Sequence, residues 1–296
     1  MRFLILGGNG YLGSKITKVL LEKGHSIVCT KRQKSDFSRL AGYMDCITMI
    51  PATTDKLKEA FTCGSFDWVL NMVCSYEQGK FFYDNVIESN IVFPLSALNL
   101  AVEHGIENYL TIGTALPNEL NMYSFTKSQF SGFGEFYAKK HGINFIDVKL
   151  EMFYGSDEPK GRFISNCIIK MLKNQDMDLT IGTQKRDIVS IHDVVSAMLC
   201  IIRAEIEGYC EIPVGTGEAP TIRDITTYIK RECGSRSNLN FGIFPMRKGE
   251  PDCIADIAKL TDIGYRCKYS WKQGIREMIK EIRENQFDGR EMFLDV

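Results

Sequence analysis

The sequence predicts an α/β protein with a doubly wound parallel sheet and a smaller mixed C-terminal lobe. Two observations predict this fold. Up to about residue 155, short apolar runs alternate with longer amphipathic segments, and uninterrupted apolar runs are typical of strands covered on both faces. Beyond that residue this regular alternation of apolar runs and amphipathic segments ends. Strand–helix alternation at this pitch implies right-handed crossovers, with helices on both faces of one sheet.

The elements of the first domain follow from the apolar pattern. The run 3–6 is the first strand and stops at a glycine pair. The segment 11–23 is the first helix, because its apolar residues recur at the spacing of one helix face, and Gly24 ends it. The later strands are expected at 27–29, 46–50, 68–70, 109–112 and 145–150, and the later helices at 91–104 and 123–141.

The second half of the chain contains shorter elements in mixed order. They are expected at 163–172, 192–203, 222–232 and 272–284 for helices, and at 186–191 and 209–214 for strands. We therefore assign 1–155 to the sheet domain and 156–296 to a smaller substrate lobe, with 186–204 returning to the first domain. Ligands of open α/β sheets bind beyond the carboxyl ends of the strands, so such a lobe would close over a ligand.

Composition excludes several classes of function. The 296 residues carry 36 Lys and Arg against 37 Asp and Glu, a net charge of −1, which argues against a nucleic-acid partner because that needs clustered basic charge. No uninterrupted apolar run approaches the 18–20 residues of a membrane-spanning helix, and the N-terminus lacks a signal-peptide pattern. The 10 cysteines form no Cys-x-x-Cys pair, so we expect no metal site and a cytoplasmic location.

A glycine-rich loop joins the first strand to the first helix. It reads Gly7-Gly8-Asn9-Gly10-Tyr11-Leu12-Gly13. In a dinucleotide-binding loop one glycine makes the tight turn, one lets the backbone approach a pyrophosphate, and one lets the helix lie against the sheet. The phosphates then meet N–H groups at the positive end of the helix. We expect Gly7, Gly10, Tyr11, Leu12 and Gly13 to contact the cofactor; the alternative is a glycine-rich turn without a ligand.

The end of the second strand indicates which dinucleotide is bound. This segment reads Thr30-Lys31-Arg32-Gln33, and the first carboxylate is Asp36. An acidic residue here would bind the ribose hydroxyls of NAD and repel the extra phosphate of NADP. Arg32 would pair with that 2′-phosphate and Lys31 would add a positive charge. The sequence therefore favours NADP, and the alternative is an ordinary solvated basic turn.

A tyrosine and a lysine stand one turn apart at the start of the helix 123–141. Tyr123 and Lys127 share a helix face, and a lysine cation draws the pKa of a nearby phenol down from about 10 toward the working pH. Thr114, at the end of the fifth strand, could donate a hydrogen bond to a substrate oxygen. We expect these three residues to be catalytic; the alternative is an exposed helix face with a surface lysine.

Together the glycine loop, Thr114 and the Tyr123/Lys127 pair resemble the extended short-chain dehydrogenase/reductase family over essentially the whole chain. Within that family the chain is similar to nucleotide-sugar 4-ketoreductases such as the CDP-abequose and paratose synthases. The resemblance implies a Rossmann-type domain and a nucleotide-diphosphate sugar as substrate. It also implies that Asn90 supports Lys127 through a water, and that helix 123–141 pairs in a homodimer.

Two arginines of the C-terminal half match the substrate-binding residues of nucleotide-sugar enzymes. Arg186, at the end of the stretch 182–187, matches the arginine presented to the substrate diphosphate. Arg247 resembles a second contact to phosphate and ribose. The alternative for Arg186 is a salt bridge to Asp187 or Asp193.

The resemblance implies an NADPH-dependent reduction of a nucleotide-activated 4-keto-(di)deoxyhexose to the 4-hydroxy sugar. Tyr123 would donate the proton, Thr114 would hydrogen-bond the carbonyl oxygen, and Arg186 with Arg247 would anchor the diphosphate. Two alternatives remain open. One is a nucleotide-sugar 4-epimerase with tightly held NAD, and the other is an NADP-binding protein without activity.

Overall fold

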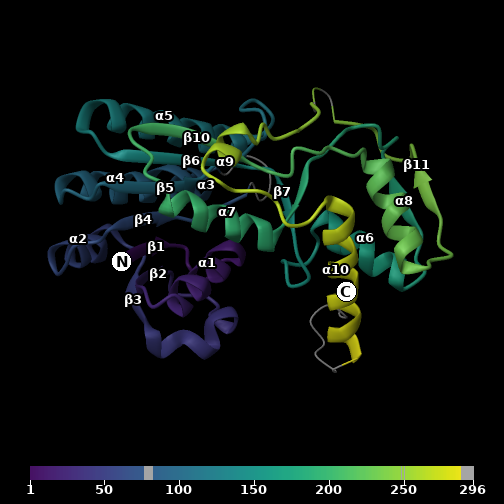
Figure 1. The fold of residues 1–296 in the computed structure, drawn as a ribbon, viewed down its shortest axis with the longest axis horizontal. Helices are drawn as coiled ribbons and strands as arrows, with labels where there is room; N and C mark the ends of the chain where they lie inside the picture. The colour runs from purple at the N-terminus through teal and green to yellow at the C-terminus, as the bar shows by residue number, and fades with distance from the viewer. Residues whose placement is uncertain (77–82, 248, 250, 288–296) are drawn as a thin grey trace. The chain divides into compact units, whose positions relative to one another are not determined.

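The computed structural model describes residues 1–76, 83–247, 249 and 251–287, which fold as two compact units. The first unit contains 1–150 and 202–212, and the second contains 151–201 and 213–296. The segment that returns to the first unit is therefore 202–212, whereas 186–201 belongs to the second unit. Figure 1 shows the elements of both units.

The first unit is built on a seven-stranded parallel sheet, which confirms the predicted fold class. The strand order is β10-β6-β5-β4-β1-β2-β3. The strands are β1 (Arg2–Leu6), β2 (Ser26–Lys31), β3 (Ile47–Pro51), β4 (Trp68–Asn71), β5 (Asn108–Ile112), β6 (Asn144–Leu150) and β10 (Tyr209–Val214). Because β1 lies in the middle, between β4 and β2, the strand order reverses there. This reversal is the place where open α/β sheets bind ligands.

Helices flank the sheet in the predicted alternation (Figure 1). They are α1 (Tyr11–Glu22), the 3₁₀ helix η1 (Ser38–Cys46), α2 (Thr54–Thr62), α3 (Asp84–Ile87), the π-helical η2 (Glu88–Val92), α4 (Phe93–Glu103) and α5 (Met122–His141). The side chain of Asn121 caps α5 at its start, and Gly142, with φ of 75°, ends it. The core contains Leu4, Leu57, Leu98, Phe130 and Phe145, contributed by strands and by α2, α4 and α5.

One continuous helical run, Asp84–Glu103, is long and apolar enough to cross a membrane by length and composition. This run was not expected from the sequence, because polar residues interrupt its apolar residues. Leu98 and Ala101 of this run are fully buried in the core of the first unit. A helix of the protein core passes the same test of length and composition, and 39% of the apolar window of this run is buried.

The second unit contains helices and two small parallel sheets. The helices are α6 (Phe163–Leu172), α7 (Ile191–Arg203), α8 (Ile222–Cys233), α9 (Ala258–Asp262) and α10 (Trp271–Phe287). The last two residues of α7, 202 and 203, belong to the first unit. The sheets pair β7 (Met152–Tyr154) with β9 (Ile188–Ser190), and β8 (Met177–Leu179) with β11 (Leu239–Phe241). Its core includes Ile168 of α6, Ile229 of α8 and Ile275 of α10.

Candidate active site

The glycine loop forms the turn that a dinucleotide needs. Gly7 has φ of +77°, a left-handed conformation that favours glycine, and the N–H of Gly10 donates to the carbonyl of Gly7 over 3.0 Å. A Cβ at Gly13 would lie 2.3 Å from that same carbonyl oxygen, so only glycine lets α1 begin against the turn. Gly10 is the N-cap of α1 and carries no side chain to occupy the first N–H groups of the helix. Those groups are suited to bind a phosphate.

The basic end of β2 is exposed, and its neighbouring carboxylate is engaged locally. Lys31 and Arg32 are both exposed. The carboxylate of Asp36 accepts hydrogen bonds from the N–H and the hydroxyl of Ser38, at 2.8 and 2.9 Å, and these bonds lower the pKa of Asp36. A further basic residue, Arg39, places its guanidinium carbon 5.2 Å from the ring centroid of Tyr11 in the glycine loop.

Lys127 is held at the carboxyl ends of two sheet strands. Its Nζ donates to the carbonyls of Val73 and Ile112, each at 2.8 Å, and the residue is only 4% exposed. This burial excludes the alternative of a surface lysine. Burial lowers the pKa of Lys127, while the charges of Cys74 and Asp147 oppose that effect. Two of the three N–H donors of the ammonium are thus used by backbone carbonyls.

Tyr123 and Thr114 lie on the same unit as Lys127. Tyr123 is half-buried in the first turn of α5, and its ring centroid lies 4.7 Å from that of Tyr76. Thr114 is half-buried after β5, and its hydroxyl oxygen accepts a hydrogen bond from the N–H of Leu116 at 3.2 Å. That contact leaves the hydroxyl proton of Thr114 for another acceptor. Tyr76 was not predicted from the sequence, because one aromatic residue in a loop carries no periodic signal.

Asn90 connects the loop after β4 to α5. Its side-chain oxygen accepts from the N–H of Ser75 at 2.8 Å, and its side-chain nitrogen donates to the carbonyl of Ser75 and the hydroxyl of Thr126, each at 3.0 Å. The residue is 1% exposed and lies in the π-helical turn η2. These direct contacts hold the loop beside Lys127. The water-mediated role implied by the family resemblance stays a prediction.

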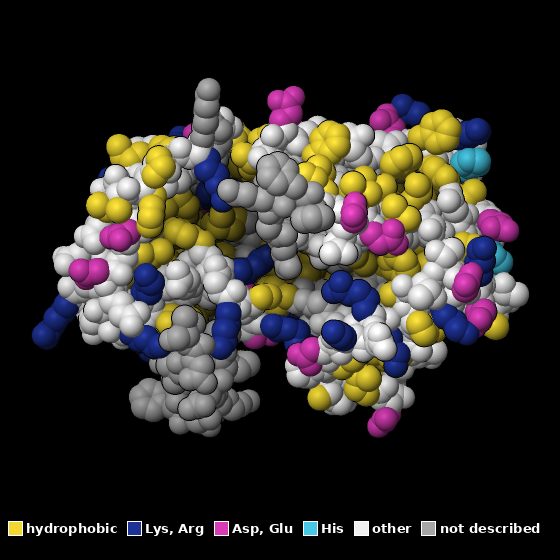
Figure 2. Space-filling view, turned by 180° about the vertical axis from the view of Figure 1, so that it is seen from behind, with side chains coloured by type: hydrophobic (Ala, Val, Ile, Leu, Met, Phe, Trp, Pro, Cys, Tyr) yellow, Lys and Arg dark blue, Asp and Glu magenta, His cyan; other side chains and the backbone are white. Residues whose placement is uncertain are grey.

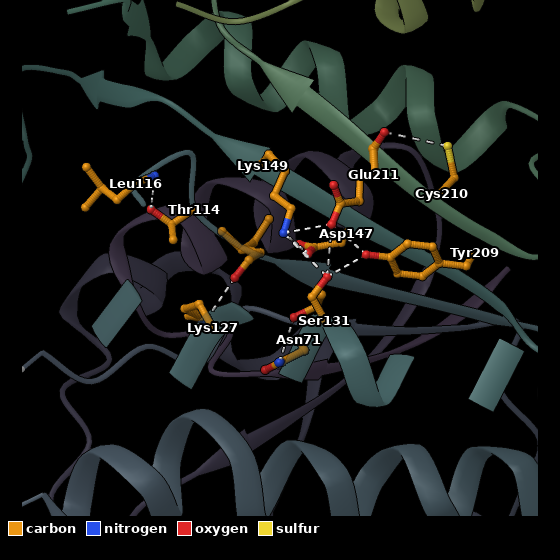
Figure 3. Close-up of polar contacts among 12 residues, drawn as sticks. Asn71, Thr114, Leu116, Lys127, Ser131, Asp147, Lys149, Tyr209, Cys210 and Glu211 are labelled. Atoms are coloured by element: carbon orange, nitrogen blue, oxygen red, sulfur yellow. Dashed lines mark hydrogen bonds and ion pairs between the residues drawn. The ribbon is translucent and has the colours of Figure 1, made fainter. Parts of the chain in front are cut away.

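A charged cluster lies beside Gly113, the residue that precedes Thr114, and Figure 3 shows its side chains. Asp147 of β6 is fully buried, and its Oδ2 lies 2.7 Å from Nζ of Lys149, which in turn lies 3.0 Å from Oε1 of Glu211. A Cβ at Gly113 would lie 2.1 Å from Oδ1 of Asp147. Burial alone would lower the pKa of Lys149, but the charge and hydrogen bond of Asp147, together with Glu211, raise it.

The hydroxyl of Tyr209 extends this cluster. It donates to Oε1 of Glu211 at 2.6 Å and lies 2.7 Å from the hydroxyl oxygen of Ser131 on α5. The cluster therefore joins β6, β10 and α5 through polar side chains. The sequence does carry a signal for this cluster: Asp147 and Lys149 stand two residues apart, on one face of a strand expected to be buried.

The two predicted substrate-binding arginines belong to the second unit. Arg186 is 4% exposed, and its Nη1 donates to the carbonyls of Lys185 and Pro251 at 2.6 and 2.7 Å. Arg247 is exposed; Lys248 and Glu250 beside it lie outside the described residues. The assignment of both arginines to the substrate diphosphate stays a prediction.

The carboxylates considered as alternative partners of Arg186 have other hydrogen-bond donors. Asp187 accepts from the N–H and the hydroxyl of Thr216 at 2.8 and 2.7 Å and from the N–H of Gly217 at 2.8 Å. Asp193 accepts from the hydroxyl of Tyr265 at 3.1 Å. The bonds of Asp187 hold residues 216 and 217 beside the residue that follows Arg186. Within the described ranges, no group of three or more His, Cys, Asp or Glu residues is arranged to hold a metal ion.

Comparison with known proteins places these features in context. The model of the NAD dependent epimerase/dehydratase family matches residues 3–214. A CDP-abequose synthase of Salmonella typhimurium is 27% identical over 294 residues, which cover 94% of this chain and 97% of the relative.

Two solved structures share the fold. UDP-glucose 4-epimerase of Thermotoga maritima, with UDP-glucose, has a TM-score of 0.84 at 19% identity and covers 97% of this chain and 100% of its own. UDP-glucuronic acid 4-epimerase of Bacillus cereus, in complex with UDP-glucuronic acid and NAD, has a TM-score of 0.82 at 20% identity and covers 96% and 99%.

Proposed function

Because the chain belongs to the NAD-dependent epimerase/dehydratase family, we propose that it uses NADPH to reduce the keto group of a nucleotide-activated 4-keto-(di)deoxyhexose. The membership confirms the family resemblance drawn from the sequence. The observation that carries the proposal is the burial of Lys127 at the ends of β4 and β5, one helical turn after Tyr123. The similarity to a CDP-abequose synthase favours a deoxysugar nucleotide as substrate.

The residues of the first unit fit a bound dinucleotide. A side chain at Gly13 would collide with the turn, because its Cβ would lie 2.3 Å from the carbonyl oxygen of Gly7. Glycine at this position therefore lets α1 pack closely against the turn, as in dinucleotide-binding loops. When bound, the nicotinamide supplies a hydride to the sugar carbonyl carbon. Exposed Lys31 and Arg32, with Asp36 engaged by Ser38, support NADP over NAD.

The side chains of this unit then act on the carbonyl oxygen. Tyr123 donates its phenolic proton as negative charge develops there. The hydroxyl of Thr114 donates a hydrogen bond that strengthens with this charge. Lys127 is positioned by two carbonyls, and its remaining N–H holds the ribose of the cofactor, while its charge favours ionisation of the phenol.

Anchoring of the substrate diphosphate is assigned to Arg186 and Arg247 of the second unit. Nη1 of Arg186 donates to two backbone carbonyls, which fix the plane of the guanidinium. A guanidinium held in a fixed plane is suited to donate to phosphate oxygens in a defined direction. Binding energy far from the carbonyl would then orient the sugar for the reaction.

We also propose a homodimer that pairs α5 with its counterpart in a second copy. Phe133 and Phe136 of α5 are 39% and 54% exposed, and Val92 of η2 is 44% exposed. Figure 2 shows hydrophobic side chains exposed among charged ones in the half of the view that holds the first unit. Size-exclusion chromatography with light scattering tests this directly: a monomer at micromolar concentration contradicts it.

The reductase is tested by mixing the purified protein with NADPH and nucleotide-4-keto-6-deoxyhexoses. Stoichiometric loss of reduced-cofactor absorbance is the expected result. A 4-epimerase is the second candidate, because the structures that share this fold include 4-epimerases. Interconversion of two nucleotide sugars without net oxidation of NADPH would establish the epimerase and overturn the reductase.

A further inference from the structure

An exposed aromatic ring stands beside the predicted proton donor. We propose that Tyr76 is a specificity-determining residue, whose ring packs against the hydroxyl-poor face of a deoxyhexose held at Tyr123. This inference rests on the proposed function and deepens it. It names the part of the sugar that this chain recognises.

The loop backbone just before Tyr76 is anchored by side chains of α5 and η2. The carbonyl of Val73 accepts a hydrogen bond from Nζ of Lys127. Two residues later, the N–H and the carbonyl of Ser75 both bond to the side chain of Asn90, which also bonds to Thr126 next to Lys127. The residue that precedes Tyr76 is therefore held by Asn90 of η2. Asn90 is itself bonded to α5, the helix that carries the predicted catalytic pair.

The two tyrosine rings form a tilted pair. Their centroids are 4.7 Å apart and their planes meet at 34°, within the range of favourable aromatic packing. Tyr76 nevertheless remains 51% exposed. Binding of a ligand over such an exposed ring is favourable, because it removes apolar surface from water.

The chemistry of the ring selects the ligand that covers it. The face of an aromatic ring offers little to replace the water lost by a hydroxyl group pressed against it, and burying an unsatisfied hydroxyl costs free energy. The methyl and methylene groups of a deoxyhexose lose no such hydrogen bonds. Tyr76 is therefore suited to a 6-deoxy or 3,6-dideoxy sugar rather than to a fully hydroxylated hexose.

The test compares binding of two nucleotide sugars to the protein–NADP complex by calorimetry. One is a nucleotide 6-deoxyhexose, and the other is the corresponding nucleotide hexose with all its hydroxyls. Tyr76→Leu should weaken binding of the deoxy sugar about tenfold and change binding of the hydroxylated sugar much less. Tyr76→Phe keeps the ring and should bind like the wild type. Phe125→Leu removes an aromatic ring of similar exposure, 47%, from α5 and serves as the matched control.

Steady-state kinetics supply a second readout. With the 4-keto-deoxy substrate, Tyr76→Leu should raise KM about tenfold with kcat nearly unchanged, since the lost contact is made in both ground and transition states. Unchanged binding of the deoxy sugar would overturn the inference. So would an equal loss of NADP affinity, because the ring would then contact the cofactor.

The failure of the proposed reaction is distinguishable from these outcomes. A wild-type protein that binds the nucleotide deoxyhexose but never oxidises NADPH contradicts the reduction. The role of Tyr76 is then still decided by the binding comparison, which requires no turnover.

Discussion

Replacement of Glu151 by glutamine should make the protein's stability less dependent on pH. Glu151 directly follows β6, is 8% exposed, and has its pKa raised from 4.5 to about 7. Burial is the main cause, the nearby charge of Asp187 adds to it, and Arg186 opposes it. Because the folded protein binds this proton more tightly than the unfolded chain, the contribution to stability is complete below pH 4.5 and is lost as the pH rises through about 7.

The magnitude follows from the two pKa values. Each pH unit between them is worth about 1.36 kcal/mol, so ionisation of Glu151 costs roughly 3 kcal/mol of unfolding free energy by pH 8. Glutamine has nearly the same shape and does not ionise. Glu151→Gln should therefore be about 3 kcal/mol more stable than the wild type at pH 8, and less than about 1 kcal/mol more stable at pH 5.

Urea unfolding at pH 5 and pH 8 measures this difference. Trp271, buried in the second unit that also contains Glu151, gives a fluorescence signal from the relevant part of the chain. Glu218→Gln changes an exposed glutamate of the same unit and should shift neither midpoint. An equal gain for Glu151→Gln at both pH values, or none at pH 8, would refute the burial of an ionisable carboxyl at this position.

Three further predictions concern the first unit. Tyr123→Phe should lower kcat by about 10²–10⁴-fold and leave the Kd of NADPH, measured by fluorescence titration, nearly unchanged; retained turnover removes Tyr123 as proton donor. Arg32→Ala should weaken NADPH by about 10- to 100-fold with little effect on NADH in the same titration, and equal losses argue against phosphate recognition. Asp147→Asn leaves Lys149 without its buried partner and should lower the free energy of unfolding in urea by about 3–5 kcal/mol. Glu211→Gln changes a side chain that is 45% exposed and should lower it by less than about 1 kcal/mol. Equal losses for the two variants would contradict the burial assigned to Asp147.

Much of the fold was predictable because a doubly wound sheet leaves a local signature. The helix expected at 123–141 is observed as Met122–His141, with Gly142 in the left-handed conformation. The strand expected at 209–214 is also found over those residues, but it joins the main sheet beside β6. Its apolar pattern predicts a strand and does not specify which neighbour it pairs with, because pairing depends on contacts distant in sequence.

The candidate site was predicted where residue spacing carries the chemistry. The glycine loop and the Tyr123/Lys127 pair are local patterns on a turn and on one helix face. Contacts that join distant segments carry no such pattern. Asn90 meets Ser75 across 15 residues, and Tyr209 meets Ser131 across 78, so only the folded chain reveals what these polar side chains bind.

Transfer of an isotope from the cofactor tests the proposed reduction most directly. NADPH labelled with deuterium at nicotinamide C4, on the face that is transferred, is incubated with the protein and a nucleotide-4-keto-6-deoxyhexose, and the product sugar is analysed by mass spectrometry and NMR. We expect one deuterium at the former carbonyl carbon, with one NADP formed per sugar. A sugar that changes configuration without gaining deuterium, while the NADPH is left unoxidised, would contradict the reduction.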